Sequence, residues 1–213
     1  MIPDGYHEVR LPPDPKREVV WRALWRYRFN SMIAPSDCVL DLGSGYGSFI
    51  NTVQARRRIA VDAWDGFPAY LSPGIEAKVG SVSDLDFLDD RSVDFAFASN
   101  LFEHLTRDDV QAVLDGLKRK LSLKGTLTLV QPNYRYAYRE YFDDFDHKSI
   151  WSHISMADFL TSQGWDVLLV EPRFMPLTVK GRLPVNERLI QAWLASPWKP
   201  IGKQMLIQAK PCA

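Results

Sequence analysis

A short apolar run that ends in alternating glycines is the feature that most constrains how this chain folds. Residues 38–42 (CVLDL) have the composition of a buried parallel strand, and Gly43, Gly45 and Gly47 follow directly. Glycine is needed where the backbone turns tightly or lies against a ligand, because no Cβ is in the way. Residues 49–57 return to a helical pattern. The sequence therefore predicts a strand, a glycine loop and a helix, the unit that binds nucleotides in α/β sheets.

The spacing around this loop discriminates between nucleotides. A dinucleotide-binding loop has the pattern G-x-G-x-x-G, whereas Ser48 stands where the third glycine would be. The next apolar run ends in Asp62, about twenty residues after the first glycine, where an acidic residue suits the hydroxyls of a ribose. Asp41 adds a second carboxylate, which a pyrophosphate would repel. A ligand with a cationic amino-acid end and an adenosine end suits both carboxylates, and an NAD-dependent enzyme is the rival interpretation.

Three motifs together carry a family resemblance. Residues 39–47 (VLDLGSGYG) resemble the first motif of the class I S-adenosylmethionine (SAM)-dependent methyltransferases. Residues 83–85 (SDL) are similar to the adenine-binding motif of that class. Residues 99–105 (SNLFEHL) resemble the end of the fourth strand in its small-molecule branch, of methyltransferase type 11. The resemblance covers roughly residues 35 to 170 and agrees at several distances at once.

The resemblance implies SAM as the cofactor, S-adenosylhomocysteine as the product, and a set of cofactor contacts. In such enzymes an aspartate at the position of Asp84 accepts the adenine amino group, and its neighbour lies against the ring. The end of the fourth strand passes beneath the methionine part. The expected cofactor-binding residues are Asp41, Gly43, Gly45, Gly47, Asp62, Ala63, Ser83, Asp84, Leu85, Asn100 and Leu101. A plain helix cap is the other explanation of Ser83 and Asp84.

The expected fold is an α/β, Rossmann-like methyltransferase sheet, mostly parallel with an antiparallel last strand and flanked by helices. We expect one domain over residues 1–213, with an N-terminal arm and helix in 1–34 and an insertion at 172–202. Strands are predicted at 58–62, 76–82, 92–98, 127–131, 165–171 and 203–209, helices at 16–33, 49–57, 108–121 and 156–163, and a turn at 124–126.

Composition narrows the partners and the compartment. The formal net charge is zero, which argues against nucleic-acid binding by general phosphate attraction. The two cysteines do not suggest a disulfide framework. Neither a signal pattern nor a bilayer-spanning apolar run is recognisable, so a cytoplasmic protein is expected.

Aromatic residues near the predicted site have two interpretations each. Trp21 and Trp25 alternate with arginines in the helix at 16–33, which either packs on the sheet with solvated arginines or forms a lid beside the site. Trp64 either covers the cofactor or packs on its own loop.

The stretch from 132 to 147 is the expected acceptor side. It is too aromatic for a linker and too charged for a core, and it follows the fifth strand at the edge that carries the cofactor loops. His147 is the preferred general base, since histidine titrates near neutral pH. The expected catalytic residues are His147, His104, Tyr134 and His153, each with a structural role as the alternative, while His7 lies in the arm.

A metal site is the less favoured interpretation of the same stretch. Asp143, Asp144, Asp146, His147 and His153 offer oxygen and nitrogen ligands. An acidic run of this kind is more often a solvated turn, so no metal is predicted.

The insertion at 172–202 resembles the corresponding region of methyltransferases associated with polysaccharide and glycolipid biosynthesis, and this resemblance implies a sugar- or lipid-linked acceptor. Residues 188–194 form an apolar helix with Trp193 and flanking basic residues, which suits a membrane surface or a partner. A helix folded over the sheet edge, or a dimer contact, is the alternative. The predicted function is methyl transfer to an oxygen or nitrogen of a small-molecule or sugar- or lipid-linked acceptor, with peripheral association at the inner membrane face as an option. A SAM-binding scaffold without catalysis is the alternative function.

Overall fold

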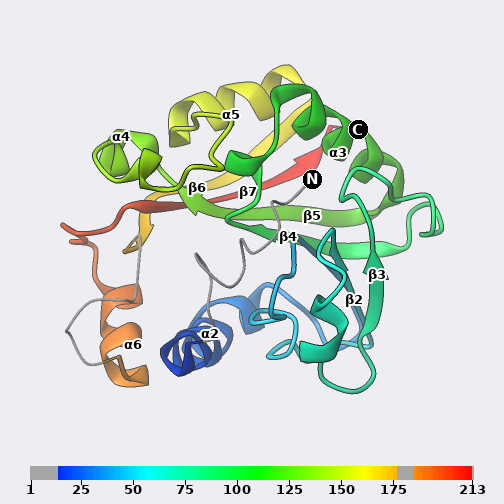
Figure 1. Ribbon diagram of the computed structural model, residues 1–213, viewed down its shortest axis with the longest axis horizontal. Coiled ribbons are helices and arrows are strands. Elements are labelled where there is room, and N and C mark those ends of the chain that lie inside the picture. Colours follow the sequence, from blue (N-terminus) through cyan, green and yellow to red (C-terminus); the bar gives the residue numbers. More distant parts are fainter. Residues whose placement is uncertain (1–13, 177–184, 213) are drawn as a thin grey trace.

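The structure is a computed structural model that describes residues 14–176 and 185–212. A seven-stranded sheet in the order β3-β2-β1-β4-β5-β7-β6 forms its centre (Figure 1). The strands are β1 (Cys38–Leu42), β2 (Arg57–Asp62), β3 (Glu76–Val79), β4 (Val93–Ser99), β5 (Leu121–Pro132), β6 (Trp165–Met175) and β7 (Gln204–Pro211). The arm at 1–13, with His7, lies outside the described residues.

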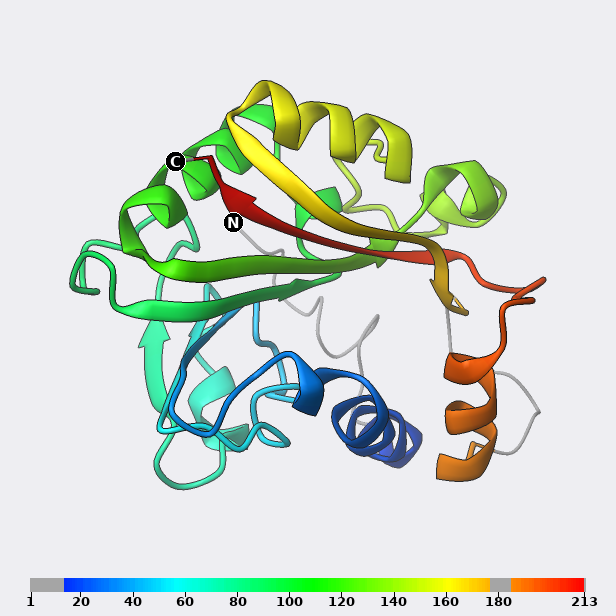
Figure 2. The ribbon, with the colours of Figure 1, turned by 180° about the vertical axis from the view of Figure 1, so that it is seen from behind.

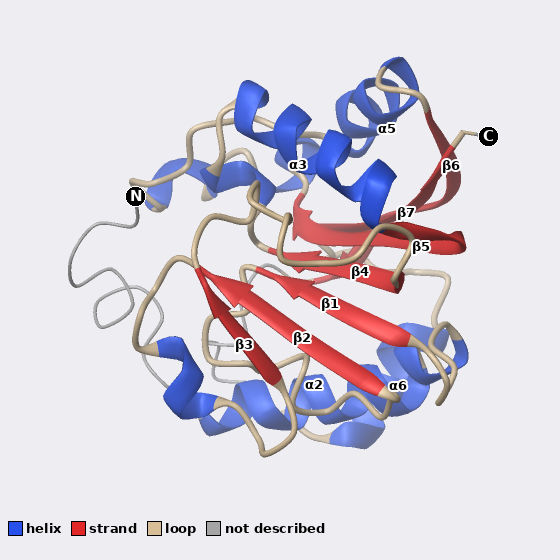
Figure 3. Ribbon diagram, turned by 90° about the vertical axis from the view of Figure 1, so that its right-hand side faces the viewer, coloured by secondary structure: helices blue, strands red, loops and turns tan. Residues whose placement is uncertain are grey.

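The pairing of the strands confirms the predicted sheet. β1 runs parallel to β2 and β4, and the parallel pairing continues from β2 to β3 and from β4 to β5. β7 lies between β5 and β6 and is antiparallel to both. The carboxyl ends of β1, β2 and β3 meet at one edge, where their arrowheads lie in Figure 3.

Helices cover both faces of this sheet. They are α2 (Pro15–Tyr27), α3 (Arg107–Lys120), α4 (Tyr134–Ala137), α5 (His153–Ser162) and α6 (Glu187–Ala195), with 3-10 turns η1 (Phe29–Ser31), η2 (Phe67–Tyr70), η3 (Phe102–His104) and η4 (Tyr141–Asp143). Figure 2 shows α3 and α5 on one face and α2 and α6 on the other. Each layer closes a separate apolar core, one around Leu114 and Leu160 and one around Leu24 and Phe29.

The sequence of α3 accounts for its boundaries. Thr106 and Asp109 form a reciprocal capping box, in which each side chain accepts a hydrogen bond from the other residue's backbone N–H. Acidic residues occupy the first turn and Lys118, Arg119 and Lys120 the last, which suits the helix dipole. The predicted inward face is the buried one and includes Leu114 and Leu117. The helix therefore occurs where the sequence predicts it, one residue earlier at each end.

The helix predicted at 16–33 is shorter than expected. The Asp14 side chain caps α2 by accepting the Lys16 N–H at 2.9 Å, and a proline opens the first turn. The helix ends at Tyr27 because Arg28 leaves helical geometry, with φ −138° and ψ −65°. The Arg28 guanidinium pairs with Glu171 on β6.

The helix predicted after the glycine loop is wrong. Residues 49–52 form turns, with a hydrogen bond from the Thr52 N–H to the Phe49 carbonyl at 2.9 Å, and residues 53–56 contain no helix. The Asn51 side chain joins this segment to the loop at residues 70–72, because it donates a hydrogen bond to the Tyr70 carbonyl and accepts one from the Ser72 N–H. In the described part of the chain, α3 is the one α-helix that connects consecutive strands among β1 to β5.

Several other boundaries differ from the prediction. β3 ends at Val79, three residues before the predicted end. β5 begins already at Leu121, and the predicted turn at 124–126 lies in an excursion where the register with β4 jumps from Leu121 to Thr126. β6 extends to Met175, and α5 begins at His153 instead of at 156. β5, β6 and α5 therefore extend into residues where the sequence predicts loops or turns, whereas β3 is shorter than predicted.

The helix of the insertion folds back onto its own chain. α6 lies beside α2, and its Trp193 donates a 2.8 Å hydrogen bond to the Phe174 carbonyl (Figure 1). Ile190 is buried in the same apolar core as Leu24. The side chains of Leu189, Trp198 and Ile201 are exposed instead. Within the described ranges, no helix combines the length and apolarity that crossing a membrane requires.

Candidate functional site

A cavity of about 590 Å³ opens at the carboxyl ends of β1, β2 and β4. This volume suits a small-molecule ligand, and the edge of a parallel sheet is the expected place for one. The cavity brings together most of the predicted cofactor-binding residues. Those that line it are Asp41, Gly43, Gly45, Asp62, Ala63, Ser83, Asn100 and Leu101.

The three glycines of the loop have positive φ values of 68°, 51° and 68° but serve different purposes. A Cβ on Gly43 would lie 2.9 Å from Leu101 Cδ1, and one on Gly47 would lie 2.7 Å from Leu71 Cδ2. A Cβ on Gly45 would meet nothing within 4 Å, because this residue borders the open cavity. Gly47 is therefore required for packing of the loop and does not line the cavity, while Gly45 leaves its backbone open to a ligand.

Asp62 at the end of β2 holds the glycine loop. Its side chain is 4% exposed, and its Oδ2 accepts the Gly45 N–H at 2.8 Å. Its Oδ1 accepts the Trp64 N–H, also at 2.8 Å. A carboxylate oxygen can accept more than one hydrogen bond, so both oxygens keep capacity for hydroxyl groups of a ligand.

Asp41 at the end of β1 is a buried carboxyl. It is 3% exposed, and Ser44 Oγ donates to its Oδ2 at 2.8 Å. Burial raises its pKa to about 7, with a smaller contribution from the charge of Asp62. A cationic group in the cavity would favour the ionised form of this residue.

Of the residues predicted to lie beside the adenine, only Ser83 lines the cavity. Asp84 is exposed and accepts the Asp86 N–H at 3.4 Å. Leu85 is 1% exposed and lies against Gly116 of α3. Asp84 and Leu85 are thus outside the cavity lining. Trp64 packs against the rings of Tyr46 and Tyr70, at 5.1 Å and 5.4 Å between centroids, and is not among the lining residues either.

Asn100 is held in a conformation that few residues other than glycine adopt. Its φ is +50°, its N–H donates to the Val130 carbonyl at 2.8 Å, and its Oδ1 accepts from Gln204 Nε2 at 2.9 Å. A non-glycine residue with positive φ at a cavity is characteristic of a functional site. It turns the chain so that Leu101 covers Gly43.

α2 contributes two lining residues, of which the sequence analysis had named Trp21 in a possible lid helix and had not identified Arg17. Arg17 lines the cavity, and burial lowers its pKa from the ordinary value. Trp21 lies between the cavity and the aromatic cluster of Phe29, Phe49 and Phe97. Trp21 therefore packs on the sheet and also borders the site, so the two interpretations of this helix are compatible. The alternation of Trp and Arg was the one available signal.

Of the four predicted catalytic residues, His104 alone lines the cavity, together with Asp146 and Lys148. Its Nδ1 lies 3.3 Å from the Asp146 carbonyl and 3.5 Å from Asp146 Oδ2. Burial lowers the pKa of His104, although the charges of Asp144 and Asp146 oppose this shift. His147 lies behind it, with its ring 4.8 Å from the His104 ring and 4.6 Å from that of Tyr141.

Tyr134 and His153 are placed away from the cavity lining. The Tyr134 ring contacts Tyr141 at a centroid distance of 5.3 Å. His153 opens α5, and its Nδ1 lies 2.9 Å from Asn133 Nδ2. These contacts give both residues a structural role in the loop that precedes α5.

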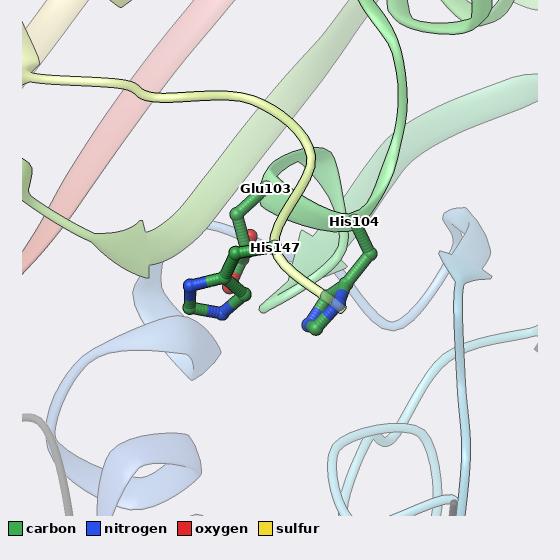
Figure 4. Close-up of side chains that lie close together, drawn as sticks. All are labelled: Glu103, His104 and His147. Atoms are coloured by element: carbon green, nitrogen blue, oxygen red, sulfur yellow. The ribbon is translucent and has the colours of Figure 1, made fainter. Parts of the chain in front are cut away.

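Glu103 is the residue that the sequence analysis missed on this side. Its side chain is 1% exposed, and neither carboxylate oxygen has a hydrogen-bond partner among the described residues. Burial raises its pKa to about 8. The ligand atoms of Glu103, His104 and His147 all lie within 4.8 Å of one another (Figure 4). The acidic run that the sequence offered as a metal site is thus replaced by a different set, of which His147 is the shared member.

Comparison with known proteins agrees with this geometry. Residues 40–129 match the methyltransferase domain family. The matched segment begins in β1 and ends in β5, and it contains the glycine loop, Asp62 and the turn at Glu103. The match covers fewer than half of the residues, so it indicates a methyltransferase domain over this segment and supports SAM as the cofactor.

Solved structures resemble this chain over nearly its whole length. A SAM-dependent methyltransferase from Archaeoglobus fulgidus has a TM-score of 0.68 at 21% identity and covers 96% of this chain and 97% of its own. A Haloferax volcanii complex of the Trm112 methyltransferase activator with a proposed methyltransferase gives 0.68 at 18%, with 98% and 93% covered. These likenesses extend to the fold.

A third solved structure with a similar fold belongs to an enzyme that acts on geranyl diphosphate. Geranyl diphosphate C-methyltransferase from Streptomyces coelicolor was solved with Mg²⁺, geranyl diphosphate and S-adenosylhomocysteine. It has a TM-score of 0.59 at 13% identity, with 84% of this chain and 72% of the other covered. None of the curated proteins matches this sequence.

The residues present fit SAM. Gly45 leaves open space where a Cβ would stand, and two buried carboxylates lie near it at the ends of adjacent strands. Asp62 suits the ribose hydroxyls, and Asp41 suits the cationic amino group.

Proposed function

We propose that this chain is an enzyme that transfers the methyl group of SAM to an oxygen or nitrogen of a small-molecule or sugar- or lipid-linked acceptor. One observation carries the proposal. The same cavity is lined by the cofactor-type residues Asp41, Gly45 and Asp62 and by the polar groups His104 and Asp146. A cofactor held by the first set would therefore face the second set across the same cavity.

Each cofactor-binding residue is assigned to a different part of SAM. In the proposal, Asp62 accepts the ribose hydroxyls, Asp41 holds the amino group, and Gly43 and Gly45 allow close approach of the backbone. Ala63, Ser83, Asn100 and Leu101 complete the wall, while Gly47 supports the loop. When bound, SAM supplies an electrophilic methyl on a sulfonium, which an acceptor atom receives by in-line displacement. The protein contributes alignment, which reduces such barriers by roughly 7–11 kcal/mol.

The acceptor side is assigned to the segment around residues 103–105 and 146–148. Hydrogen-bond donors and acceptors line the cavity there, from the side chains of His104, Asp146 and Lys148. These groups support a polar acceptor atom. The exposed apolar side chains of Leu189, Trp198 and Ile201 support a lipid-linked acceptor, or a membrane or dimer contact.

Transfer of labelled methyl groups tests this function. Purified protein is incubated with methyl-labelled SAM and panels of hydroxyl- and amine-bearing acceptors, including saccharide and lipid-linked compounds. We expect label in one acceptor class and none with Asp62→Ala, whereas the exposed Asp86→Ala serves as the matched control. Tight cofactor binding without label in any acceptor or in cell extract would point to a SAM-binding scaffold instead.

A further inference from the structure

The buried side chain of Glu103 is the least explained polar group in the described part of the chain. It is 1% exposed, and both of its oxygens lack hydrogen-bond partners there. An unpaired buried carboxylate is costly, because its desolvation is not compensated. Neighbouring carboxylates do not help, since Asp144 acts on it with like charge. Without a cation the burial favours the protonated form of Glu103, and a bound cation would compensate the ionised form.

Two imidazoles adjoin this carboxylate. The ligand atoms of Glu103, His104 and His147 lie within 4.8 Å of one another, and Figure 4 shows the three side chains extending into one space from the η3 turn and the loop before α5. Tetrahedral zinc bonds of about 2.0–2.2 Å place ligand atoms about 3.5 Å apart. Closing the three groups around an ion thus requires side-chain shifts on the order of an ångström.

The backbone fixes these ligands relative to one another. The Glu103 carbonyl accepts the N–H groups of Lys148 and Ser149 at 2.8 Å and 3.1 Å. Ser149 Oγ donates to the Leu105 carbonyl at 2.6 Å, and Trp151 Nε1 donates to the Phe102 carbonyl at 3.3 Å. These hydrogen bonds fix the η3 turn and the loop that carries His147 relative to each other, as a preorganised site requires.

The Asp146 carboxylate also contacts the His104 ring. Asp146 Oδ2 lies 3.5 Å from His104 Nδ1, and the Asp146 carbonyl lies 3.3 Å from the same atom. A histidine that binds a metal through one ring nitrogen usually donates its other N–H to such an oxygen. The Asp146 contacts therefore fix the orientation of the His104 ring beside Glu103 and His147.

We propose that Glu103, His104 and His147 form a binding site for a divalent transition-metal ion at the border of the methyltransferase cavity. Two imidazoles and one carboxylate suit Zn²⁺, Co²⁺ or Fe²⁺ and are too rich in nitrogen for Mg²⁺ or Ca²⁺. Three protein ligands leave a coordination position open, as in catalytic zinc sites. His104 also lines the cavity, so the ion lies beside it.

A titration with Co²⁺ tests the site directly. Protein treated with a chelator and freed of it receives Co²⁺, whose visible absorption reports coordination by nitrogen and oxygen. We expect saturation at one equivalent, loss of the bands on adding Zn²⁺, and no effect of equal Mg²⁺. Glu103→Gln and His147→Ala should each weaken binding at least about tenfold. His153→Ala is the matched control, because this histidine lies outside the cluster and should leave the titration unchanged.

The variants also separate this proposal from the proposed function. Glu103→Gln keeps the shape of the side chain and replaces a group that can ionise and bind a cation with a neutral amide, so it should fold and bind S-adenosylhomocysteine as the native chain does. Absence of saturable Co²⁺ binding, binding unchanged in both variants, or equal loss in His153→Ala would overturn the metal site. None of these results depends on methyl transfer.

Discussion

The backbone N–H of Gly45 donates a 2.8 Å hydrogen bond to Oδ2 of Asp62, which joins the glycine loop after β1 to the end of β2. The residue that is expected to bind the ribose therefore also sets the position of the loop. Because the bond uses one lone pair of one oxygen, the carboxylate can hold the loop and a ligand together. The glycine loop is thus held beside Asp62 by the chain's own hydrogen bond, without a ligand.

Gly45→Ala should weaken S-adenosylhomocysteine binding at least about tenfold, because the new methyl enters the open cavity. Positive φ at this residue should also lower stability by about 1 kcal/mol. Gly164→Ala is the matched control, since its φ is +74° and its Cβ would also meet nothing within 4 Å. Calorimetric titration and thermal unfolding of both variants measure the two effects. Equal binding losses in the two variants would contradict the assignment.

Asp41→Asn should stabilise the ligand-free protein at pH 8. The pKa of Asp41 is about 7 in the folded protein and near 3.8 ordinarily, so the folded state holds a proton that the unfolded state has lost between these values. Stability therefore falls as pH rises through this window, by up to about 4 kcal/mol. Asparagine should recover on the order of 2 kcal/mol of this loss.

The same substitution should act on binding in the opposite direction. The introduced amide is neutral, so a cationic amino group loses its charged partner and S-adenosylhomocysteine should bind at least about tenfold more weakly. Chemical unfolding at pH 8 and pH 5, with calorimetry at pH 8, gives both measurements. The stability gain should shrink at pH 5. A variant that is less stable at pH 8 and binds normally would show that Asp41 is merely structural.

Arg17→Ala should weaken S-adenosylhomocysteine binding by about tenfold, because a partly buried guanidinium at the cavity suits the ligand's carboxylate. Arg22 lies on the same helix, is exposed and does not line this cavity, so Arg22→Ala is the control. Fluorescence or calorimetric titration compares the two. If Arg17→Ala changes acceptor KM alone, the arginine belongs to the acceptor side.

His104→Ala should lower kcat at least about 100-fold while S-adenosylhomocysteine binding changes less than about threefold. The reason is that this side chain borders the cavity on the acceptor side, where misplacement by an ångström costs about that factor. His147→Ala should have a similar effect through its contact with His104. His153→Ala should retain turnover. Full activity in His104→Ala would place the acceptor elsewhere.

The sequence predicted the sheet well because its signals are local. Buried apolar runs such as residues 38–42, capping residues such as Thr106, and glycines with positive φ depend on neighbours in the chain. The helix after the glycine loop failed because the Asn51 side chain binds a loop some twenty residues away, which no periodicity reveals.

The candidate site was predictable on one side only. Asp41, Asp62 and Asn100 stand at fixed positions after strands, and the cavity contains all three. The acceptor side depends on hydrogen bonds between η3 and the loop before α5, which bring Glu103 to His147 from more than forty residues away. Glu103 stood within a recognised motif, but its burial could not be inferred from spacing.

Calorimetric titration of the purified protein with S-adenosylhomocysteine tests the central claim most directly. The account predicts one saturable site in the native protein. Binding should be lost or weakened at least about 100-fold in Asp62→Ala and unchanged in Asp86→Ala, with no response to NAD. Absence of binding by S-adenosylhomocysteine, or tight binding of NAD at the same cavity, would contradict it.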